Sequence, residues 1–285
     1  MTPILLDFSQ RPELGLHARV IADVEAAAAP MGVDSLIVGA FARDLHLQYQ
    51  HGIAMQRQTQ DIDFALAVPD WATFDRLREQ LISGERFRAY ANIAHRLRHH
   101  TGLPVDLVPF GGIELADRTI AWPPRGASVT DVFGFREGLA DALPVVFPGG
   151  IRSRTVSLAA LAVLKIVCWQ DRHYKAPRKD AHDLQMILCH YLAAGNEPRL
   201  WNEFVEWTLH DDFDYERAGP RMLGRDIGQL LNQDGLALVA RIISDQTDPD
   251  SSGRLPTEMN PADPDRAIAW LDALVHAMHE KPERP

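Results

Sequence analysis

The sequence predicts an α/β (α+β) protein, with a mixed sheet and flanking helices in residues 1–150 and a helical domain in residues 151–285. In the first half, short apolar runs with strand-like alternation are separated by helical segments, which is the pattern of a sheet covered by helices. From Ser157 onward, the apolar residues recur with helical spacing. The pair Gly149-Gly150 lies between the two patterns, and we place the domain boundary there.

The overall composition is that of a globular protein with enough apolar material for a core. Of its 285 residues, 46% are hydrophobic and 24% are charged, and the formal net charge is −10. Broad binding to DNA or RNA depends on Lys and Arg that neutralise phosphates, so the acidic balance argues against sequence-independent nucleic-acid binding. A local basic patch is compatible with this charge, and an acidic surface can also hold divalent cations.

The sequence indicates a cytoplasmic protein with no membrane association. The N-terminal segment has no basic region followed by a long apolar run, so it does not predict a secretory signal. No stretch reaches the roughly 18 apolar residues that a membrane-spanning helix needs. The two cysteines, Cys168 and Cys189, lie in apolar helical segments, and we expect buried thiols in a reducing compartment.

Secondary structure in the first half follows from apolar spacing and from turn residues. Helices are expected over residues 12–30, 40–50 and 71–82, and strands over residues 36–38 and 61–68. Asp70 precedes the third helix, where its side chain can accept a hydrogen bond from the first turn as an N-cap. Two further strand-like runs, 93–100 and 104–109, are separated by Thr101-Gly102-Leu103, which is a hairpin signal.

The remainder of the chain has a weakly patterned segment followed by helices. Residues 111–155 are rich in Gly and Pro and predict strands only weakly. The expected helical segments are 157–170, 180–194, 198–244 with interruptions, and 267–278. Residues 245–262 are rich in Pro, Ser and Asp and predict a loop.

Three aspartates carry the main chemical signal of the sequence. Residues i and i+2 of a strand face the same way, so Asp61 and Asp63 present their carboxylates together while Ile62 and Phe64 enter the core. Adjacent carboxylates resist joint ionisation unless a cation lies between them, and Mg²⁺ prefers such oxygen ligands. Asp106, on another apolar strand, completes a set suited to two metal ions. The alternative is a pair of solvated aspartates on an edge strand.

The segments around these residues resemble the DNA polymerase β-like nucleotidyltransferase superfamily: LIVGAFARDLHL, TQDIDFAL and VDLVPFG. That pattern is a strand ending in Gly-Gly or Gly-Ser, a helix, Asp-x-Asp on a second strand, and a later single Asp. With Lys165 and the segment KDAHDL at residues 179–184, the chain is most similar to the AbiEii-like nucleotidyltransferases, the toxin components of type IV toxin–antitoxin systems. The resemblance covers about residues 33–190.

This resemblance implies a reaction and its ligands. It implies transfer of a nucleoside monophosphate from a nucleoside triphosphate such as ATP to an acceptor hydroxyl, with release of pyrophosphate. It also implies Mg²⁺ or Mn²⁺ as cofactor, RNA or a small molecule as acceptor, and an antitoxin as partner. The catalytic and metal-binding residues would be Asp61, Asp63 and Asp106. The nucleotide and metal would occupy a cleft between the two domains.

The residues expected to bind the nucleotide are Gly39, Ala40, Arg43, Lys165 and Lys179. Ala40 departs from the serine often found at this turn, so phosphate contact there would come from backbone N–H groups at the helix start. Each basic residue also has a structural alternative. Arg43 can pair with Asp44 on the surface, Lys165 can meet an acidic group inside its apolar helix, and Lys179 can simply open a capped helix.

Two further functional readings stay open. A small-molecule nucleotidyltransferase, such as an aminoglycoside-modifying enzyme, would offer an acidic pocket to a cationic sugar. A non-catalytic module would bind a nucleotide or a partner and keep the carboxylates without turnover. Residues 86–100 contain four arginines and three histidines, which form either a basic rim for a polyanionic acceptor or the solvated face of a hairpin.

Overall fold

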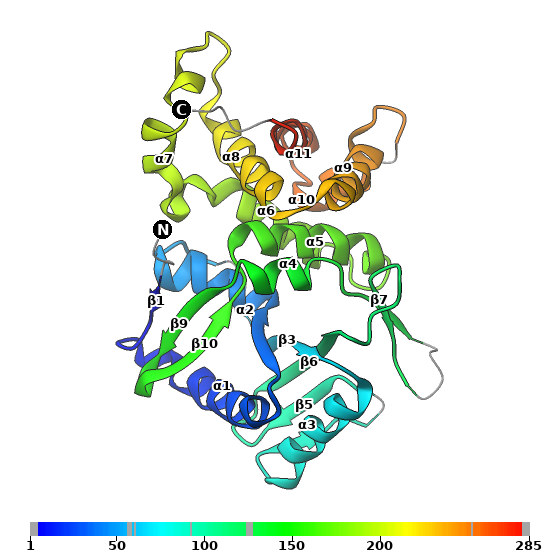
Figure 1. Cartoon of the computed structure of the whole chain (residues 1–285). Helices are drawn as coiled ribbons and strands as arrows, with labels where there is room; N and C mark the ends of the chain where they lie inside the picture. Colours follow the sequence, from blue (N-terminus) through cyan, green and yellow to red (C-terminus); the bar gives the residue numbers. More distant parts are fainter. Residues whose placement is uncertain are drawn as a thin grey trace. The chain divides into compact units, whose positions relative to one another are not determined.

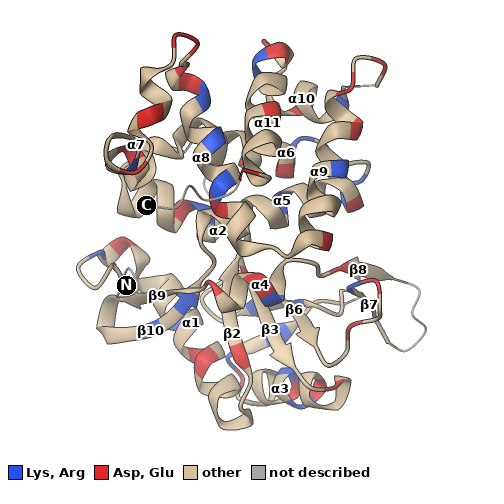
Figure 2. Cartoon of the chain, turned by 45° about the horizontal axis from the view of Figure 1, so that its top comes forward, with Lys and Arg blue, Asp and Glu red and all other residues tan. Residues whose placement is uncertain are grey.

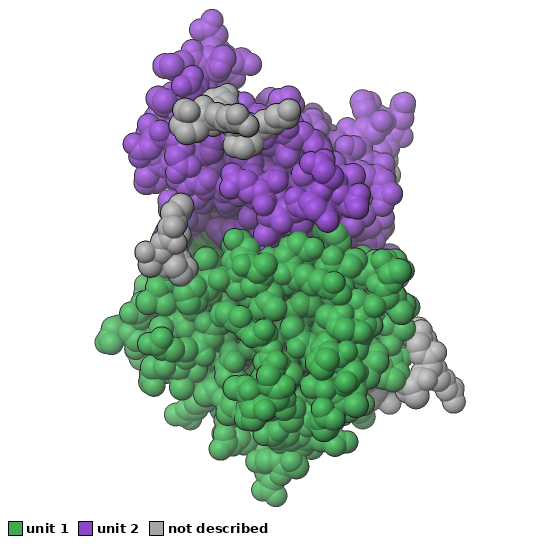
Figure 3. All heavy atoms as spheres, viewed as in Figure 1, with its two compact units in different colours: residues 1–50, 54–157 green, residues 51–53, 158–285 purple. Residues whose placement is uncertain are grey.

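A computed structural model describes residues 5–55, 59, 61–91, 93–123, 128–251 and 253–280. The chain divides into two compact units, coloured separately in Figure 3. Unit 1 comprises residues 1–50 and 54–157, and unit 2 comprises residues 51–53 and 158–285.

The division between the units lies several residues beyond Gly149-Gly150. These two glycines, with φ of 79° and 72°, lie in the turn that joins β9 (Leu143–Phe147) to β10 (Ile151–Thr155). β10 pairs with β9 and also with β2, so the hairpin is an integral part of the sheet in unit 1. The domain bounds 1–150 and 151–285 stay a prediction.

Unit 1 is built on an eight-stranded mixed sheet with the strand order β1-β9-β10-β2-β3-β6-β5-β4 (Figure 1). Its other strands are β1 (Leu6–Asp7), β2 (Asp34–Val38), β3 (Ile62–Val68), β4 (Phe87–Ala89), β5 (Arg96–His99) and β6 (Pro104–Gly111). β3 runs parallel to β6 and antiparallel to β2, and β6 runs antiparallel to β5. The expected strands and the hairpin are therefore present, and β4 extends the hairpin to the sheet edge.

The register of the central strands places one row of residues directly opposite one another. Val38 on β2 pairs with Asp63 on β3, and Asp63 pairs with Asp106 on β6. Arg96 on β5 then pairs with Asp106. This row lies where β2 ends and where β3 begins, so the carboxylates share one end of the sheet.

Helices of unit 1 pack against this sheet. α1 (Gly15–Ala28), between the short 3₁₀ turns η1 (Pro12–Leu14) and η2 (Ala29–Met31), contacts β2, β10 and α3 (Trp71–Ser83). Asp70 caps α3 as predicted, because its carboxylate accepts a 2.7 Å hydrogen bond from the Thr73 amide. The helix expected over residues 40–50 consists of α2 (Gly39–Asp44) and the wider π-helical turn η3 (Leu45–Gln50).

Residues 111–155, the segment with weak strand patterns, form several small elements in addition to the strands β9 and β10. β7 (Thr119–Ala121) and β8 (Val129–Asp131) form a separate two-stranded sheet. α4 (Phe135–Ala140) and the turn η4 (Pro148–Gly150) complete the segment. Ion pairs connect the start of this segment to α4; the residues involved are Glu114, Arg118, Arg136 and Glu137.

Among its described residues, the regular elements of unit 2 are all helices or helical turns. Its helices and turns are α5 (Leu158–Arg172), α6 (Lys179–His190), η5 (Leu192–Asn196), α7 (Glu197–Asn202), η6 (Val205–Leu209), α8 (Tyr215–Leu230), α9 (Gln233–Thr247), α10 (Arg254–Met259) and α11 (Pro264–Met278). The prediction of a loop over residues 245–262 is partly wrong, because α10 buries Leu255 and Met259 inside it. The final helix is confirmed, and it packs extensively on α8.

Two smaller expectations have different outcomes. Cys168 is half-buried and Cys189 is exposed, so the prediction of two buried thiols is wrong. Both are free cysteines, as expected. Within the part of the chain that the structure describes, no helix has the length and apolar character needed to cross a membrane.

Candidate active site

Three carboxylates gather at one end of the unit 1 sheet. Asp61 directly precedes β3, Asp63 lies on β3, and Asp106 lies opposite Asp63 on β6. Ile62 and Phe64, between and beyond the first two, are fully buried, as the strand alternation predicts. The core side chains on one face of β3 thus hold the aspartates on its other face.

The geometry of this carboxylate cluster suits a divalent cation. One carboxylate oxygen from each of Asp61, Asp63 and Asp106 lies within 4.8 Å of the others. All three residues are half-buried. A set made only of carboxylate oxygens matches the preference of Mg²⁺ and Mn²⁺, and partial exposure leaves room for substrate oxygens.

Gly39 allows the turn after β2 to approach the cluster. Its φ is +72°, and a Cβ atom at this position would lie 1.9 Å from Asp63 Oδ2. A side chain at this turn would therefore occupy the position of the Asp63 carboxylate. The glycine expected in the nucleotide site is needed here because the backbone and the carboxylate are in close contact.

Replacing Gly39 by Ala is expected to displace the Asp63 carboxylate. Mn²⁺ binding should then be lost together with the nucleotide transfer that the resemblance implies. The matched control is Gly32→Ala, since Gly32 has a similar φ of +65° but open space around the added Cβ. Both variants should lose about 1–2 kcal/mol of stability through the left-handed backbone conformation. Isothermal calorimetry with Mn²⁺ and a transfer assay should show losses in Gly39→Ala but not in Gly32→Ala. A wild-type Mn²⁺ affinity in Gly39→Ala would contradict the assignment of Asp63 as a metal ligand.

Arg96 is a member of the site that the sequence analysis did not single out. Its Nε and Nη2 donate to Asp106 Oδ1 and Oδ2 at 2.7 and 2.6 Å, and Nη2 also donates to Asp61 Oδ2 at 3.0 Å. The hydrogen bonds to Asp106 raise the pKa of Arg96 above its usual value. The sequence assigned this arginine only to a basic stretch, because its partner depends on the hairpin register.

Arg43 and Ala40 lie on the helix that follows Gly39. Arg43 donates to Asp44 Oδ1 through Nε at 2.9 Å and Nη2 at 2.6 Å, and Thr59 donates to the other oxygen of Asp44. The pair that the sequence allowed on the surface is instead buried, with both side chains about 5% exposed. Ala40 is half-buried in the first turn of α2. Their contacts with phosphate stay predictions.

Lys165 and Lys179, the two remaining candidates, belong to unit 2. The Lys165 ammonium is buried and lies 3.1 Å from Asp180 Oδ1 and 2.5 Å from Asp183 Oδ2. Burial lowers its pKa, but Asp183 and Asp180 outweigh that effect and keep the pKa above its usual value. Arg172 donates to both oxygens of Asp180. Lys179 is half-buried as the first residue of α6.

Acid should weaken this buried network by protonating Asp180, while Lys165 keeps its charge. Burial raises the pKa of Asp180, but Lys165 and Arg172 outweigh it and lower the pKa from 3.8 to about 2. A depressed carboxyl pKa contributes stability above the unfolded-state pKa, and this contribution is lost as the pH falls from 3.8 to about 2. The expected loss is about 2 kcal/mol. Urea unfolding at several pH values should show it in the wild type but not in Asp180→Asn.

A second group of potential ligands lies elsewhere in unit 1. Asp23, His99 and His100 bring one ligand atom each within 4.8 Å of one another. His99 Nε2 lies 3.0 Å from Asp23 Oδ2, and Arg86 also pairs with this carboxylate. The Thr101 amide donates to His99 Nδ1, so the proton of a neutral ring lies on Nε2 and is donated to Asp23. Asp23 is therefore already paired with Arg86 and hydrogen-bonded to His99.

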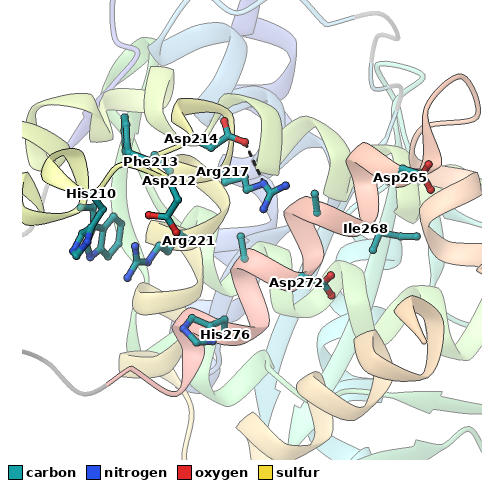
Figure 4. A pocket seen from close by; sticks show the side chains of 14 residues that line it. His210, Asp212, Phe213, Asp214, Arg217, Arg221, Asp265, Ile268, Asp272 and His276 are labelled. Atoms are coloured by element: carbon teal, nitrogen blue, oxygen red, sulfur yellow. Dashed lines mark ion pairs between the residues drawn. The ribbon is translucent and has the colours of Figure 1, made fainter. Parts of the chain in front are cut away.

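A pocket in unit 2 is lined by none of the predicted site residues. Its volume is about 590 Å³, and side chains from η6, α8, α11 and the segment before α8 surround it (Figure 4). Asp214 and Arg217 form an ion pair at its wall. The Arg221 guanidinium lies 4.0 Å from the centre of the Trp207 ring. Acidic and basic residues are interspersed along the helices of this unit (Figure 2).

The mixed sheet followed by a helical region is a nucleotidyltransferase-like fold, and its aspartates occupy neighbouring parallel strands. The match of a family model gives the class of the protein, which is nucleotidyltransferase. A family model described as "Nucleotidyl transferase AbiEii toxin, Type IV TA system" matches residues 36–273, and the chain belongs to this family. The resemblance stated from the motifs is confirmed, and the match extends well past residue 190.

Comparison with solved structures finds several distant similarities. The crystal structure of ANT(2″)-Ia in complex with adenylyl-2″-tobramycin is 15% identical, with a TM-score of 0.39, and the match covers 67% of this chain and 98% of that one. An antigenic nucleotidyltransferase-like protein from Paracoccidioides brasiliensis is 17% identical, with a TM-score of 0.39 and coverage of 67% and 91%. A search of curated proteins finds no match.

Proposed function

We propose that this nucleotidyltransferase transfers a nucleoside monophosphate to a hydroxyl group of RNA, with divalent cations held by Asp61, Asp63 and Asp106. The observation that carries the proposal is the carboxylate cluster, whose oxygens approach within 4.8 Å. Like charges at this separation favour a shared cation. When bound, Mg²⁺ or Mn²⁺ would neutralise phosphate charge and favour departure of pyrophosphate.

Each residue of the cluster has a proposed role. Asp61 and Asp63 would hold one cation, which would neutralise charge on the leaving phosphates, and together with Asp106 they would hold a second. Asp106 would accept the proton of the attacking hydroxyl, or a cation held by Asp106 would help to remove it. The hydroxyl oxygen then bonds to the α-phosphorus while the bond to pyrophosphate breaks. Most of the rate enhancement comes from positioning and charge neutralisation.

The remaining candidates bind the triphosphate in this proposal. Amides at Gly39 and Ala40 begin a continuous helical segment from α2 into η3, and such amides favour an anion. Arg43, Lys165 and Lys179 supply positive charge. Asp180 and Asp183 position Lys165, since both contact its ammonium. The roles of Lys165 and Lys179 rest on the sequence resemblance.

An RNA acceptor is supported by charge at the edge of the unit 1 sheet. Arg88 on β4 and Arg98 on β5 are direct cross-strand partners, and both are exposed. Like charges directly opposite each other destabilise a sheet, whereas a phosphate backbone beside them relieves the repulsion. The cluster aspartate Asp106 lies on β6, the next strand of the same sheet.

Label transfer tests donor, acceptor and turnover in one assay. The full chain is incubated with Mg²⁺ and each of ATP, CTP, GTP and UTP labelled at the α-phosphate, with total RNA or an aminoglycoside as acceptor. Label on RNA, with a mass increase of one nucleotide, is the expected result. Label on the aminoglycoside would replace RNA by a small-molecule acceptor. Nucleotide binding by calorimetry without any transfer would favour a non-catalytic module.

Toxicity and an antitoxin partner are proposed on the basis of family membership. Induced expression of the wild-type chain should slow growth of a bacterial host, whereas an equal amount of Asp63→Asn should not. Growth arrest by both proteins would separate toxicity from nucleotide transfer.

A further inference from the structure

The cation nearest to the carboxylate cluster is a side chain of this protein. Arg96 donates hydrogen bonds to both carboxylate oxygens of Asp106, and its Nη2 also donates to Asp61. The exposed fractions of the Arg96, Asp61 and Asp106 side chains are 30%, 20% and 13%. A bidentate guanidinium–carboxylate pair that is partly withdrawn from water is among the stronger ion pairs.

Arg96 and a divalent cation would use the same oxygens. Arginine stays charged at all ordinary pH values, so the guanidinium cannot release Asp106 by losing a proton. A cation that binds Asp106 must therefore displace one or both of these hydrogen bonds, or share the carboxylate with them. Either event weakens cation binding relative to the same cluster without Arg96.

The charge of the cluster limits how many cations it can take. Three ionised aspartates and one arginine leave two negative charges, which a single divalent cation neutralises. A second divalent cation would make the site strongly positive unless another anion arrives with it. A nucleoside triphosphate brings several negative charges, and it also offers phosphate oxygens to the displaced guanidinium.

We propose that Arg96 is the resident counter-ion of the carboxylate cluster and makes binding of the second divalent cation depend on the nucleotide. The inference rests on the proposed function, and it adds an ordered loading of the site. One cation binds from solution, and the second binds together with the triphosphate as Arg96 turns from Asp106 to phosphate.

Mn²⁺ titration of the nucleotide-free full chain, followed by electron paramagnetic resonance and calorimetry, tests this proposal. Arg96→Gln is expected to bind Mn²⁺ about tenfold or more tightly than the wild type, because one positive charge leaves the immediate site. Arg98→Gln is the matched control. It removes the same charge from the same face of β5, but Arg98 lies opposite Pro104 and not opposite Asp106. Its Mn²⁺ affinity should stay within about threefold of the wild type.

A nucleotide analogue with a non-hydrolysable α–β linkage provides the second readout. With the analogue, the wild type should take up a second Mn²⁺, and the difference in Mn²⁺ affinity between wild type and Arg96→Gln should shrink. Arg96→Lys keeps the positive charge but cannot form the bidentate hydrogen bonds. Its Mn²⁺ affinity without nucleotide should lie between those of the wild type and Arg96→Gln. If Arg96→Gln does not fold by circular dichroism, the Lys variant decides the question.

The outcomes distinguish this inference from the proposed function. Unchanged Mn²⁺ affinity in a folded Arg96→Gln, or in Arg96→Lys where the Gln variant is unfolded, overturns the counter-ion role. Asp63→Asn and Asp106→Asn should each weaken Mn²⁺ binding. If neither does so, the cation does not bind the cluster, and the metal assignment itself fails.

Discussion

Replacing Asp63 by Asn is expected to reduce nucleotide transfer by about 10³-fold or more, because cation-assisted charge neutralisation contributes several kcal/mol to such reactions. The asparagine side chain has nearly the same shape, so the buried neighbours Ile62 and Phe64 keep their packing. Steady-state rates with α-labelled nucleotide measure the effect. Asp61→Asn should behave similarly, since Asp61 belongs to the same cluster.

Asp70→Asn is the matched control for this charge removal. Asp70 is also a carboxylate in unit 1, but it caps α3 through the Thr73 amide. Asparagine is an equally good N-cap, so both stability and transfer should stay near wild-type values. Transfer by Asp63→Asn at the wild-type rate would refute the assignment of the cluster as the catalytic site.

Replacing Lys165 by Met should destabilise the protein by about 3–5 kcal/mol, because it leaves carboxylates buried without their ammonium partner. The side chains of Lys165, Asp180 and Asp183 are all 5% exposed or less, so water cannot replace the lost contact. Methionine keeps the length and the apolar stem of the lysine. Equilibrium urea unfolding followed by circular dichroism measures the change in the free energy of unfolding.

Two companion variants test the cause of that loss. Arg172→Gln removes another cation from Asp180, but the Arg172 side chain is 40% exposed and should cost only about 1 kcal/mol. In Lys165→Met/Asp183→Asn the carboxylate that lost its ammonium contact is removed as well, so part of the stability should return. A double variant as unstable as the sum of its single changes would show that charge pairing does not hold this site together.

Much of the carboxylate cluster could be predicted from local sequence. The period of two in a strand places Asp61 and Asp63 on one face, and the apolar neighbours Ile62 and Phe64 determine which face is buried. A lone aspartate in the apolar run around Asp106 was enough to suggest a third ligand. The structure adds that β3 and β6 are adjacent and in a register that pairs Asp63 with Asp106.

Errors arose where short segments are stabilised by distant contacts. α10 lies in a segment rich in Pro, Ser and Asp, yet Trp169 on α5 donates to Glu258 on α10, and Leu255 is fully buried. Local propensity does not contain these contacts. Cys189 lies in an apolar helical segment but on the exposed side of α6, because only the packing of a helix determines which of its residues face solvent.

The sequence alone determined that Arg96 and Arg98 lie on the same face of their strand, because residues i and i+2 of a strand point the same way. The tertiary structure decided which arginine reaches the aspartate. A turn of three residues, as expected at Thr101-Gly102-Leu103, would have placed Arg98 opposite Asp106. In the structure, His99 is the last residue of β5 and its amide donates to the Leu103 carbonyl. The turn therefore comprises His100-Thr101-Gly102, one residue earlier than expected, and the register shifts by two residues. The physical reason is that a turn's hydrogen bonds set strand register, whereas strand periodicity only assigns faces.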